Sequence, residues 1–407
     1  MSNNPTLKSP PSLAKRPQPL SYIRWLLIFV AISFVLLSVI ALMGEGLSSK
    51  MILLIGFSAA GAIGSVLFLS VLFFNLMANI IANGKDRQRE QWIYSETQKS
   101  RRALQIISAE LLTGHDSNSS RHASAENLIK NQSIITSQPD RQGQIAVYHS
   151  QLASDPNKSP GVITQDTLDQ LLTPVIAQLE KLPSSHSLKI TLNLAVSLNV
   201  DEVKNYIAQK LNNSNAKINY EFISGDGIGF IDSWMDTEYT SECLLLIIAL
   251  QIAPVPAKNT AEAGIALLLG NRLTQKSLPV MALLHRPDKV ESHELKASLH
   301  QAGENVPVKE QDAQYLWLAG LTEKQYQTTC DLTGCYPVMS IKTENIINVD
   351  SSLGDAGVAA AWLAIAATAH ATTLTQGPHF IITGDKTKEE MWSLVIAPEH
   401  SQQEKDT

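Results

Sequence analysis

The pattern of hydrophobic positions changes character near residue 85. Before that point, residues 25–43 (WLLIFVAISFVLLSVIALM) and residues 51–83 contain no charged side chain. A helix rises about 1.5 Å per residue, so the first run matches a hydrocarbon core of about 30 Å and the second exceeds it. The two runs predict a transmembrane helical hairpin over residues 21–84. The extra length of the second run predicts a tilted span or an interfacial turn at its end.

A cleaved signal peptide is the competing interpretation of the first run. Its apolar stretch is too long for that role, no clean small-residue cleavage site follows, and a second apolar run comes at once. A helical hairpin therefore remains the favoured interpretation.

The basic residues predict how the hairpin is oriented. The second span is followed by a cluster of six, and the N-terminal tail over residues 1–20 together with the start of the first span carries four. They are Lys8, Lys15, Arg16, Arg24, Lys85, Arg87, Arg89, Lys99, Arg101 and Arg102. Such residues accumulate on the cytoplasmic side of a membrane. The sequence therefore predicts a multi-pass protein of the inner (cytoplasmic) membrane, with its tail and its soluble domain in the cytoplasm.

Small residues recur at every fourth position of the second span, at Gly56, Ala60 and Gly64. Such residues let two helices approach closely within lipid. They are expected to pack against the first span, although a homodimer through the same face is also open. Neither span contains a charged residue, which argues against an ion or proton path.

The segment over residues 85–140 is predicted to be a stalk and a flexible linker. Residues 85–112 are charged and helix-prone, with apolar points that include Leu104, Ile107 and Leu111. Residues 113–139 are polar and rich in serine and asparagine, as exposed connections are. His115 and His122 are read as solvated linker residues, because no acidic or cysteine partner is near them in sequence.

Beyond residue 140 the chain alternates between the periodicities of helices and strands. Helices are predicted at residues 167–181, 200–211, 292–302, 323–332 and 352–370. Strands are predicted at residues 188–197, 217–224, 241–253, 264–271, 278–285, 314–321, 335–342, 380–384 and 391–398. Residues 264–271 and 278–285 are expected to pair with each other. This alternation predicts an α/β domain of mixed sheets covered by helices, ending in a polar tail over residues 401–407.

Two stretches of this domain resemble a known family. NVDSSLGDAGVAAAWLAIAATAHA (residues 348–371), followed by HFIITG and EMWSLVIAP, resembles the C-terminal half of thiolase-like β-ketoacyl synthases. AEAGIALLLGNRL (residues 261–273), followed by LPVMALLHRP, is similar to the same family's strand, helix-turn and strand. The resemblance covers roughly residues 188–398 and rests on the order of elements. It implies a layered thiolase-like fold with two pseudo-equivalent halves, over residues 141–290 and 291–400.

The residues that perform the chemistry of that family are not found at the matching positions of this sequence. A condensing enzyme uses a thiolate on a strand-to-helix turn and two imidazoles that stabilise developing negative charge. After the strand LLLIIALQI the chain has APVPAKNTAEAG, without cysteine. AGLTEKQ stands at the position of the first family histidine, and at the second position Gly354-Asp355 replaces the family's Gly-His pair. No catalytic, cofactor-binding or metal-binding residue is therefore assigned, no cofactor is implied, and the domain is predicted to be a non-catalytic scaffold.

Composition adds two constraints. The 407-residue chain has a formal net charge of −6, so no overall basic field suggests nucleic acid. Cys243, Cys330 and Cys335 are too few and too unevenly spaced for a disulfide framework or a common metal site. They are expected to be small core residues of a protein in a reducing compartment.

Four other features carry both a structural and a functional interpretation. GDGIGF (residues 225–230) could cradle an anion, but it lacks the remaining residues of a nucleotide-binding loop, so a tight turn with a short helix containing Trp234 is favoured. The nearby acids could gather a cation or form a solvated face; they are Asp226, Asp232, Asp236, Glu238 and Glu242. His285 and Arg286 are read as a salt-bridged strand end rather than a binding site. Trp317 and Trp362 are expected in the core.

A membrane tether joined to such a domain resembles the lipase-adaptor proteins of bacterial type VI secretion. That resemblance implies a membrane-anchored, non-catalytic adaptor that binds a protein cargo or a component of a secretion complex. The alternative is a membrane-tethered acyl-transferring enzyme, with Cys243, Cys330 or Cys335 as its nucleophile. A structural component of a membrane complex without separable cargo is a third interpretation.

Overall fold

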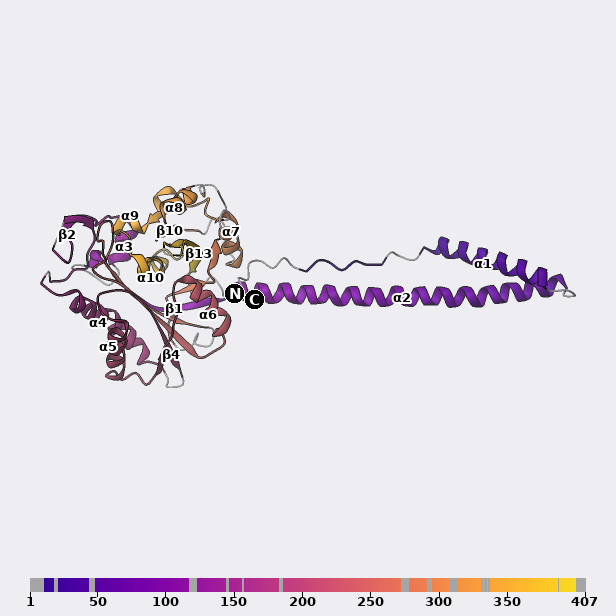
Figure 1. Ribbon diagram of the computed structural model, residues 1–407, viewed down its shortest axis with the longest axis horizontal. Coiled ribbons are helices and arrows are strands. Elements are labelled where there is room, and N and C mark those ends of the chain that lie inside the picture. The colour runs from indigo at the N-terminus through magenta and orange to yellow at the C-terminus, as the bar shows by residue number, and fades with distance from the viewer. Residues whose placement is uncertain are drawn as a thin grey trace. The chain divides into compact units, whose positions relative to one another are not determined.

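The computed structural model describes most of the chain. It covers residues 11–17, 21–43, 48–116, 123–143, 146–155, 157–182, 186–271, 278–290, 295–306, 313–330, 332, 335, 337–386 and 388–399. His122 and the predicted tail over residues 401–407 lie outside these ranges. The chain divides into two compact units, Met1–Gln98 and Lys99–Thr407, each of which is described by itself (Figure 1).

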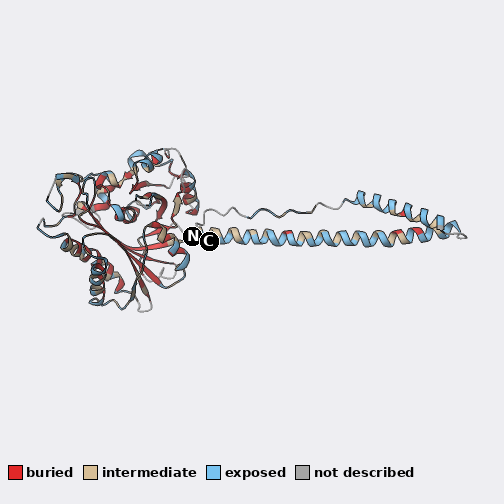
Figure 2. Cartoon of the chain, viewed as in Figure 1, coloured by how far each residue is buried: buried red, intermediate tan, exposed pale blue. Residues whose placement is uncertain are grey.

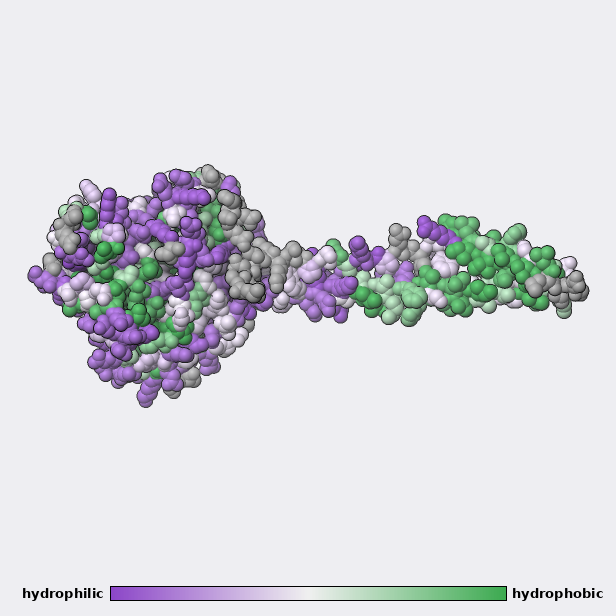
Figure 3. Space-filling view, viewed as in Figure 1, coloured by the Kyte–Doolittle hydropathy of each residue, from purple (hydrophilic) through white to green (hydrophobic). Residues whose placement is uncertain are grey.

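The first unit contains two long helices, α1 (Tyr22–Met43) and α2 (Ser49–Ser100). Both are long and apolar enough to cross a membrane, and their most apolar windows are only 6% and 11% buried. Figure 3 shows hydrophobic side chains covering α1 and the facing part of α2. A third such stretch, Gly357–Thr375, is 72% buried within the other unit and is therefore a core helix. The two N-terminal helices could span a membrane.

The two helices pack against each other through the small residues of α2. A Cβ atom on Gly56 would lie 2.5 Å from Leu37 Cδ2, and one on Gly64 would lie 3.2 Å from the ring of Phe29. Ala60, between them, is fully buried. Contacts advance along α2 as they recede along α1, so the helices form an antiparallel hairpin. The predicted packing of this face against the first span is confirmed.

The continuation of α2 past its apolar run agrees with the helix-prone stalk predicted from residue 85, but only as far as Ser100. No interfacial turn follows the apolar run, because α2 continues as a helix to Ser100. The N-terminal segment lies against this extension: Ala14 N–H and the Arg16 guanidinium donate to Asp86, at 3.0 and 3.2 Å, and Arg89 donates to a backbone carbonyl of the same segment. Both flanks of the hairpin are therefore at the same end of it.

The second unit is built from two series of strands and helices. The first contains β1 (Ala103–Leu112), α4 (Pro160–Leu179), β4 (Ser187–Ala195), α5 (Val200–Asn212), β5 (Asn219–Phe222), α6 (Ile228–Thr237), β6 (Cys243–Gln251) and β7 (Ala263–Gly270). The second contains β8 (Ala282–His285), α7 (Leu295–Asn305), β10 (Tyr315–Ala319), α8 (Glu323–Cys330), β11 (Ile346–Asn348), α9 (Val349–Leu353), α10 (Ala360–Thr375), β12 (His379–Asp385) and β13 (Glu390–Ala397).

Shorter elements connect or extend these series. They are η1 (Gly114–Asp116), α3 (Ala123–Ile129), β2 (Thr136–Pro139), β3 (Ala146–His149), β9 (Asp288–Val290), η4 (Thr343–Asn345) and η5 (Gly357–Ala359). β2 and β3 form a separate two-stranded sheet, and β9 pairs with β13.

The main sheet repeats one arrangement twice. Its order is β11-β10-β12-β13-β8-β1-β7-β6-β4-β5. At one edge, β5 pairs parallel with β4, and β4 pairs parallel with β6. The next two strands, β7 and β1, follow in antiparallel pairing. From the opposite edge, β11, β10 and β12 are parallel, and β13 and β8 follow antiparallel. The two halves meet where β1 pairs antiparallel with β8.

This arrangement moves the boundaries predicted from the sequence. The first strand of each half lies before the expected start at residues 141 and 291: β1 falls in the predicted stalk, and β8 in the predicted first half. Apolar residues of β1, such as Leu104, Ile107 and Leu111, fit helical spacing as well as a strand buried on both faces, which explains the misassignment. The predicted flexible linker also contains α3, whose Leu128 is fully buried.

Three hydrophobic clusters define five layers. α4 and α5 cover the outer face of the first half, where Leu171, Ile190 and Ile207 share one cluster. α7 covers the outer face of the second half. α6 and α10 lie between the halves in the largest cluster, which holds Trp317 and Trp362 as predicted. Figure 2 shows the strands of this unit as largely buried, and most residues of α10 are buried as well.

Three other local predictions differ from the structure. Residues 335–342 contain a turn instead of a strand, and the edge strand is β11. β7 and β8 do not pair, because β1 lies between them. The predicted helix over residues 352–370 is interrupted between α9 and α10, where Gly354 and Gly357 have φ values of 99° and 52°. Positive φ is accessible to glycine at little cost, so these two residues set the break.

Close packing at Gly56 predicts that a larger side chain there separates the helices. In full-length protein carrying Phe29→Cys and Gly64→Cys, added Gly56→Leu should lower the yield of the intrachain disulfide several-fold. Gly61→Leu is the matched control, because no atom lies within 4 Å of a Cβ at that position. Equal disulfide yields in the two variants would contradict the hairpin contact.

Candidate functional site

The turn that leads into α6 lies in the middle layer of the domain. Its glycines are required by geometry: Gly227 has a φ of 70°, and a Cβ on Gly225 would lie 2.6 Å from the Phe230 ring. The middle-layer face of β4 holds the turn, because Thr191 donates to Gly225 O at 2.7 Å and Asn193 Oδ1 accepts from Gly227 N–H at 3.4 Å. The tight-turn interpretation of GDGIGF is therefore confirmed.

The position that sequence reasoning assigned to a nucleophile is not a strand-to-helix turn. The chain after LLLIIALQI connects β6 to β7, which is another strand. In the first half, the strand-to-helix turn that enters the middle layer is the one between β5 and α6. It carries Gly225, Asp226 and Gly227, and thus a carboxylate where a thiolate chemistry would need a cysteine.

Two lysines after β12 gather four carboxylates around this turn. We call these residues the ion-pair cluster; they are Asp226, Asp350, Asp355, Asp385, Lys386 and Lys388. Lys388 Nζ lies 2.6 Å from Asp226 and 3.8 Å from Asp385. Lys386 Nζ lies 2.7 Å from Asp355 and 3.5 Å from Asp350. The cluster joins the turn before α6 to the segment before α10.

Burial and neighbouring charges shift the pKa values of three residues in the cluster. Burial raises the pKa of Asp350, and this outweighs the opposing effects of Lys386 and of Gly320 N–H, which donates to both carboxylate oxygens at 3.1 Å. Burial alone would lower the pKa of Lys386, but Asp350 and Asp355 raise it overall. The hydrogen bond to Asp226 raises the pKa of Lys388. Both lysines are therefore held as ammonium ions.

Asp355, which stands where the family resemblance places a histidine, serves a backbone connection. Its carbonyl oxygen accepts from Ala261 N–H at 2.9 Å and from Gln251 Nε2 at 2.8 Å. Its carboxylate accepts from Gly357 N–H at 2.9 Å. A Cβ on Gly354 would lie 2.5 Å from Thr260 O, so glycine alone fits beside Asp355. The Gly354-Asp355 pair thus ties the β6–β7 loop to the start of α10.

The other expected histidine position, residues 319–325, is closed by backbone packing. A Cβ on Gly320 would lie 2.8 Å from Gly384 O, and one on Gly384 would lie 2.6 Å from Gly320 O. Gln325 Oε1 accepts from Thr322 N–H at 2.9 Å. The ends of β10 and β12 therefore touch directly.

His285 and Arg286 have the structural roles that were favoured, with one exception. Arg286 pairs with Asp232 at 2.6 Å and with Asp236 at 2.8 Å, as a salt-bridged strand end would. His285 is 2% exposed, yet neither of its ring nitrogens has a hydrogen-bond partner among the residues that the structure describes. Burial lowers its pKa to about 4. The ring is therefore neutral at pH 7.

The remaining candidates are accounted for by local packing. Glu238 pairs with Lys189 at 2.8 Å, and no group of three metal-ligating side chains occurs in the described part of the chain. Cys243 is buried, and burial raises the pKa of its thiol, whereas Cys330 is exposed on α8. His115 is half-buried rather than solvated, and burial lowers its pKa.

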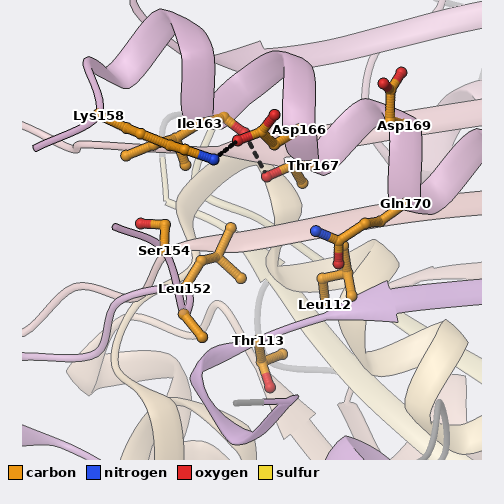
Figure 4. Close-up of a pocket in the computed structure, with 11 residues that line it drawn as sticks. Leu112, Thr113, Leu152, Ser154, Lys158, Ile163, Asp166, Thr167, Asp169 and Gln170 are labelled. Atoms are coloured by element: carbon orange, nitrogen blue, oxygen red, sulfur yellow. Dashed lines mark hydrogen bonds and ion pairs between the residues drawn. The ribbon is translucent and has the colours of Figure 1, made fainter. Parts of the chain in front are cut away.

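A cavity apart from the ion-pair cluster lies between α4 and the loop after β3. It encloses about 350 Å³ (Figure 4). Its lining mixes leucine and isoleucine with hydroxyl, amide and charged groups: Leu112, Thr113, Leu152, Ala153, Ser154, Lys158, Ile163, Asp166, Thr167, Asp169 and Gln170. Figure 4 shows Lys158 reaching Asp166 at its rim, an exposed ion pair with a 2.7 Å separation. A smaller cavity of about 190 Å³ lies beside Tyr326 and Asp350.

A buried ion pair fixes one wall of the larger cavity. Arg141 and Glu262, whose side chains are 8% and 1% exposed, lie 2.7 Å apart. Glu262 also accepts from Leu152 N–H at 3.0 Å, and Arg141 donates to Ser154 Oγ at 2.7 Å. Sequence reasoning missed this pair because its members are far apart in the chain and neither stands in a recognisable motif.

The sequence matches no protein-family model and no curated protein. Among solved structures, the ishigamide ketosynthase/chain length factor is similar with a TM-score of 0.50 and 10% identity, over 73% of this chain and 99% of that chain. The ketosynthase from module 1 of the bacillaene synthase of Bacillus amyloliquefaciens FZB42 is similar with a TM-score of 0.48 and 11% identity, over 74% and 72% of the two chains. At such identities the likeness concerns the fold. The protein has a thiolase-like α/β domain preceded by two long apolar helices.

Removal of one partner of a buried ion pair leaves an uncompensated charge. Glu262→Ala should therefore lower the free energy of unfolding by about 3–5 kcal/mol, measured by denaturant titration of the full-length protein. Asp166→Ala, which breaks the exposed pair with Lys158, should cost less than about 1 kcal/mol. Similar losses in both variants would contradict a structural role for Glu262.

Two buried histidines predict a loss of stability in acid. The folded-state pKa values of His285 and His379 are lowered to about 4 and about 3, whereas an unfolded histidine titrates near 6.5. The unfolded chain therefore binds more protons below pH 6.5, and stability falls from there toward pH 4. His285→Leu removes these ring nitrogens. It should reduce the loss in the free energy of unfolding between pH 7 and pH 4 by up to about 3 kcal/mol. Thermal melts of the full-length protein between pH 7 and pH 4 test it, and an unchanged slope would contradict it.

Proposed function

We propose that this protein is a membrane-anchored, non-catalytic adaptor that binds a protein cargo. In this proposal the α1–α2 hairpin spans the inner (cytoplasmic) membrane and the thiolase-like domain lies in the cytoplasm. Two observations support the arrangement. The basic residues flank the hairpin on both sides, and the contacts of Asp86 with Ala14 and Arg16 bring the two flanks to the same end.

The observation that carries the proposal is the ion-pair cluster. Carbon–carbon bond formation of the ketosynthase type needs a thiolate nucleophile and groups that stabilise an oxyanion. The turn before α6 and the segment before α10 instead supply Asp226 and Asp355, each paired with a lysine. A carboxylate bound to an ammonium ion can act neither as a thiolate nor as an imidazole. The same positions do, however, tie two turns and two halves of the sheet together, as a scaffold requires.

The class of cargo follows from the resemblance to type VI secretion lipase adaptors. We propose that the domain presents a lipase-like effector, or a component of the secretion complex, close to the membrane. The cavity of about 190 Å³ is below the usual size of a ligand pocket and the one of about 350 Å³ is at the low end of that range. Both have mixed linings, which favours recognition through an exposed face. Membrane anchoring would raise the local concentration of such a cargo near a membrane-embedded complex.

An acyl-transferring enzyme is the second candidate function, and the observation that favours it is the thiolase-like fold. Its nucleophile would be Cys243, Cys330 or Cys335. Cys243 is buried with a raised pKa, and Cys330 lies near the end of α8, with Sγ 3.6 Å from Tyr326 O. Neither lies on a strand-to-helix turn. The enzyme would therefore need a site unlike that of the family it resembles.

Co-purification separates the two candidates. Full-length protein solubilised in mild detergent from its native host should retain a lipase-like or secretion-apparatus protein in near-stoichiometric amount, identified by mass spectrometry. A variant with Cys243→Ala, Cys330→Ala and Cys335→Ala should retain the same cargo. Recovery of an acylated cysteine or an acyl-carrier protein, lost in the triple variant and without a protein cargo, would overturn the adaptor proposal.

A further inference from the structure

The two helices of the hairpin differ in apolar length. Trp25, the first residue of the apolar run in α1, packs against Phe68 with ring centroids 5.3 Å apart. The apolar run of α2 starts opposite the end of α1 but continues past Phe68 to residue 83. α2 therefore extends well beyond the point at which α1 begins.

A bilayer cannot cover the whole of this run. Residues 51–83 span about 50 Å as a helix, against a hydrocarbon thickness of about 30 Å. Tilt alone would have to exceed about 50°, whereas transmembrane helices rarely tilt beyond about 40°. Since α1 matches the bilayer, the excess lies on the side of the Phe68 end, over residues 69–83. Apolar side chains there need a cover other than hydrocarbon.

One stripe of α2 has the spacing of a coiled-coil seam. Its members alternate in steps of three and four residues and are all more than half exposed: Val66 64%, Leu69 59%, Phe73 58%, Leu76 55% and Ile80 63%. We call this stripe the α2 seam. A repeat of 3.5 residues lets two helices interlock along their whole contact. The next positions in the pattern are Asn83 and Arg87, so the seam ends with the apolar run.

The opposite face of the same segment is already covered by the chain itself. Ala82 is 3% exposed, and Asp86 one turn further on accepts hydrogen bonds from Ala14 and Arg16. This face continues the contact that Gly56 and Gly64 make with α1. The α2 seam lies on the other side of the helix and has no cover from the described residues of this chain.

We infer that a second copy of this chain covers the α2 seam in a parallel, two-fold symmetric dimer. All copies enter a membrane in the same direction, so the seams of two copies stand at the same height and in the same register. A 3.5-residue seam is complementary to its own copy in that arrangement. Burial of seam side chains that would otherwise meet water drives the pairing.

Dimerisation places two thiolase-like domains on the same side of the membrane and close to each other. Two cargo-binding faces would then act together, and weak single contacts would gain from the high effective concentration. The inference rests on the proposed membrane insertion of the hairpin. It does not depend on the identity of the cargo or on the absence of catalysis.

Cysteine cross-linking in native membranes tests the seam. In a Cys330→Ser, Cys335→Ser background, Leu76→Cys should form an intermolecular disulfide at least about tenfold faster than Phe74→Cys under mild oxidation. Phe74 is the matched control because it is 70% exposed, lies at nearly the same depth and points about 160° away around the helix. Equal rates at the two positions, or no cross-link at Leu76, would overturn the inference.

A measurement of particle mass provides an independent check. Full-length protein in lipid nanodiscs should contain two chains per particle, and Phe73→Ser with Leu76→Ser should shift it to one, whereas Phe74→Ser should not. Single chains in the unchanged protein would also overturn the inference. Release of the protein from membranes by alkaline carbonate would instead refute the proposed insertion, so the two failures are distinguishable.

Discussion

The pairing of β1 with β8 is the contact on which the second unit depends. Ala103 lies opposite His285, and Leu104 opposite Leu284, so the two halves share one continuous sheet instead of packing as separate domains. α10 rests on the middle-layer face of this junction, where its His370 lies 2.6 Å from Ala109 O on β1. The alanines of α10 allow strands of both halves to approach it closely. A helix of larger residues could not fit between the two halves of the sheet.

Residues next to the β1–β8 junction also hold α6 in place. Arg102, directly before β1, donates to Met235 O at 2.7 Å, and Arg286, directly after β8, pairs with Asp232 and Asp236. Both arginines thus hold the second part of α6 against the sheet. The first turn of α6 is held separately, by Thr191 and Asn193 of β4. α6 is fixed at both ends, which is what places Asp226 within reach of Lys388.

The hairpin follows a different constraint. No hydrophobic effect drives two apolar helices together in lipid, so under the proposed membrane insertion the close approach at small residues such as Gly56 and Gly64 would supply the packing energy. Packing fixes the register between α1 and α2, and register then determines how far α2 extends past its partner. The exposed seam beyond Phe68 is a consequence of that register and of the unequal apolar lengths. If the hairpin inserts and pairs as proposed, then membrane thickness, helix packing and self-association are linked in this unit.

The sequence by itself determined the features that depend on neighbouring residues. The starts of the two N-terminal helices, the alternation that produces β4 and the start of α5, where Asn199 and Glu202 form a capping box, are all local features. Each was predicted to within a few residues. The thiolase-like arrangement was also foreseen, because the order of strands and helices is preserved even where residues are not.

Only the tertiary structure decided which distant residues meet. β1 reads equally well as a helix or a strand until its neighbours β7 and β8 are known, because a segment buried on both faces has no alternating pattern. Asp226 and Lys388 are separated by 162 positions in the sequence, and no local motif links them. Their ion pair arises because the turn before α6 and the end of β12 lie in the same layer. Local periodicity is a property of consecutive residues, whereas the ion-pair cluster depends on the order of the strands in the sheet.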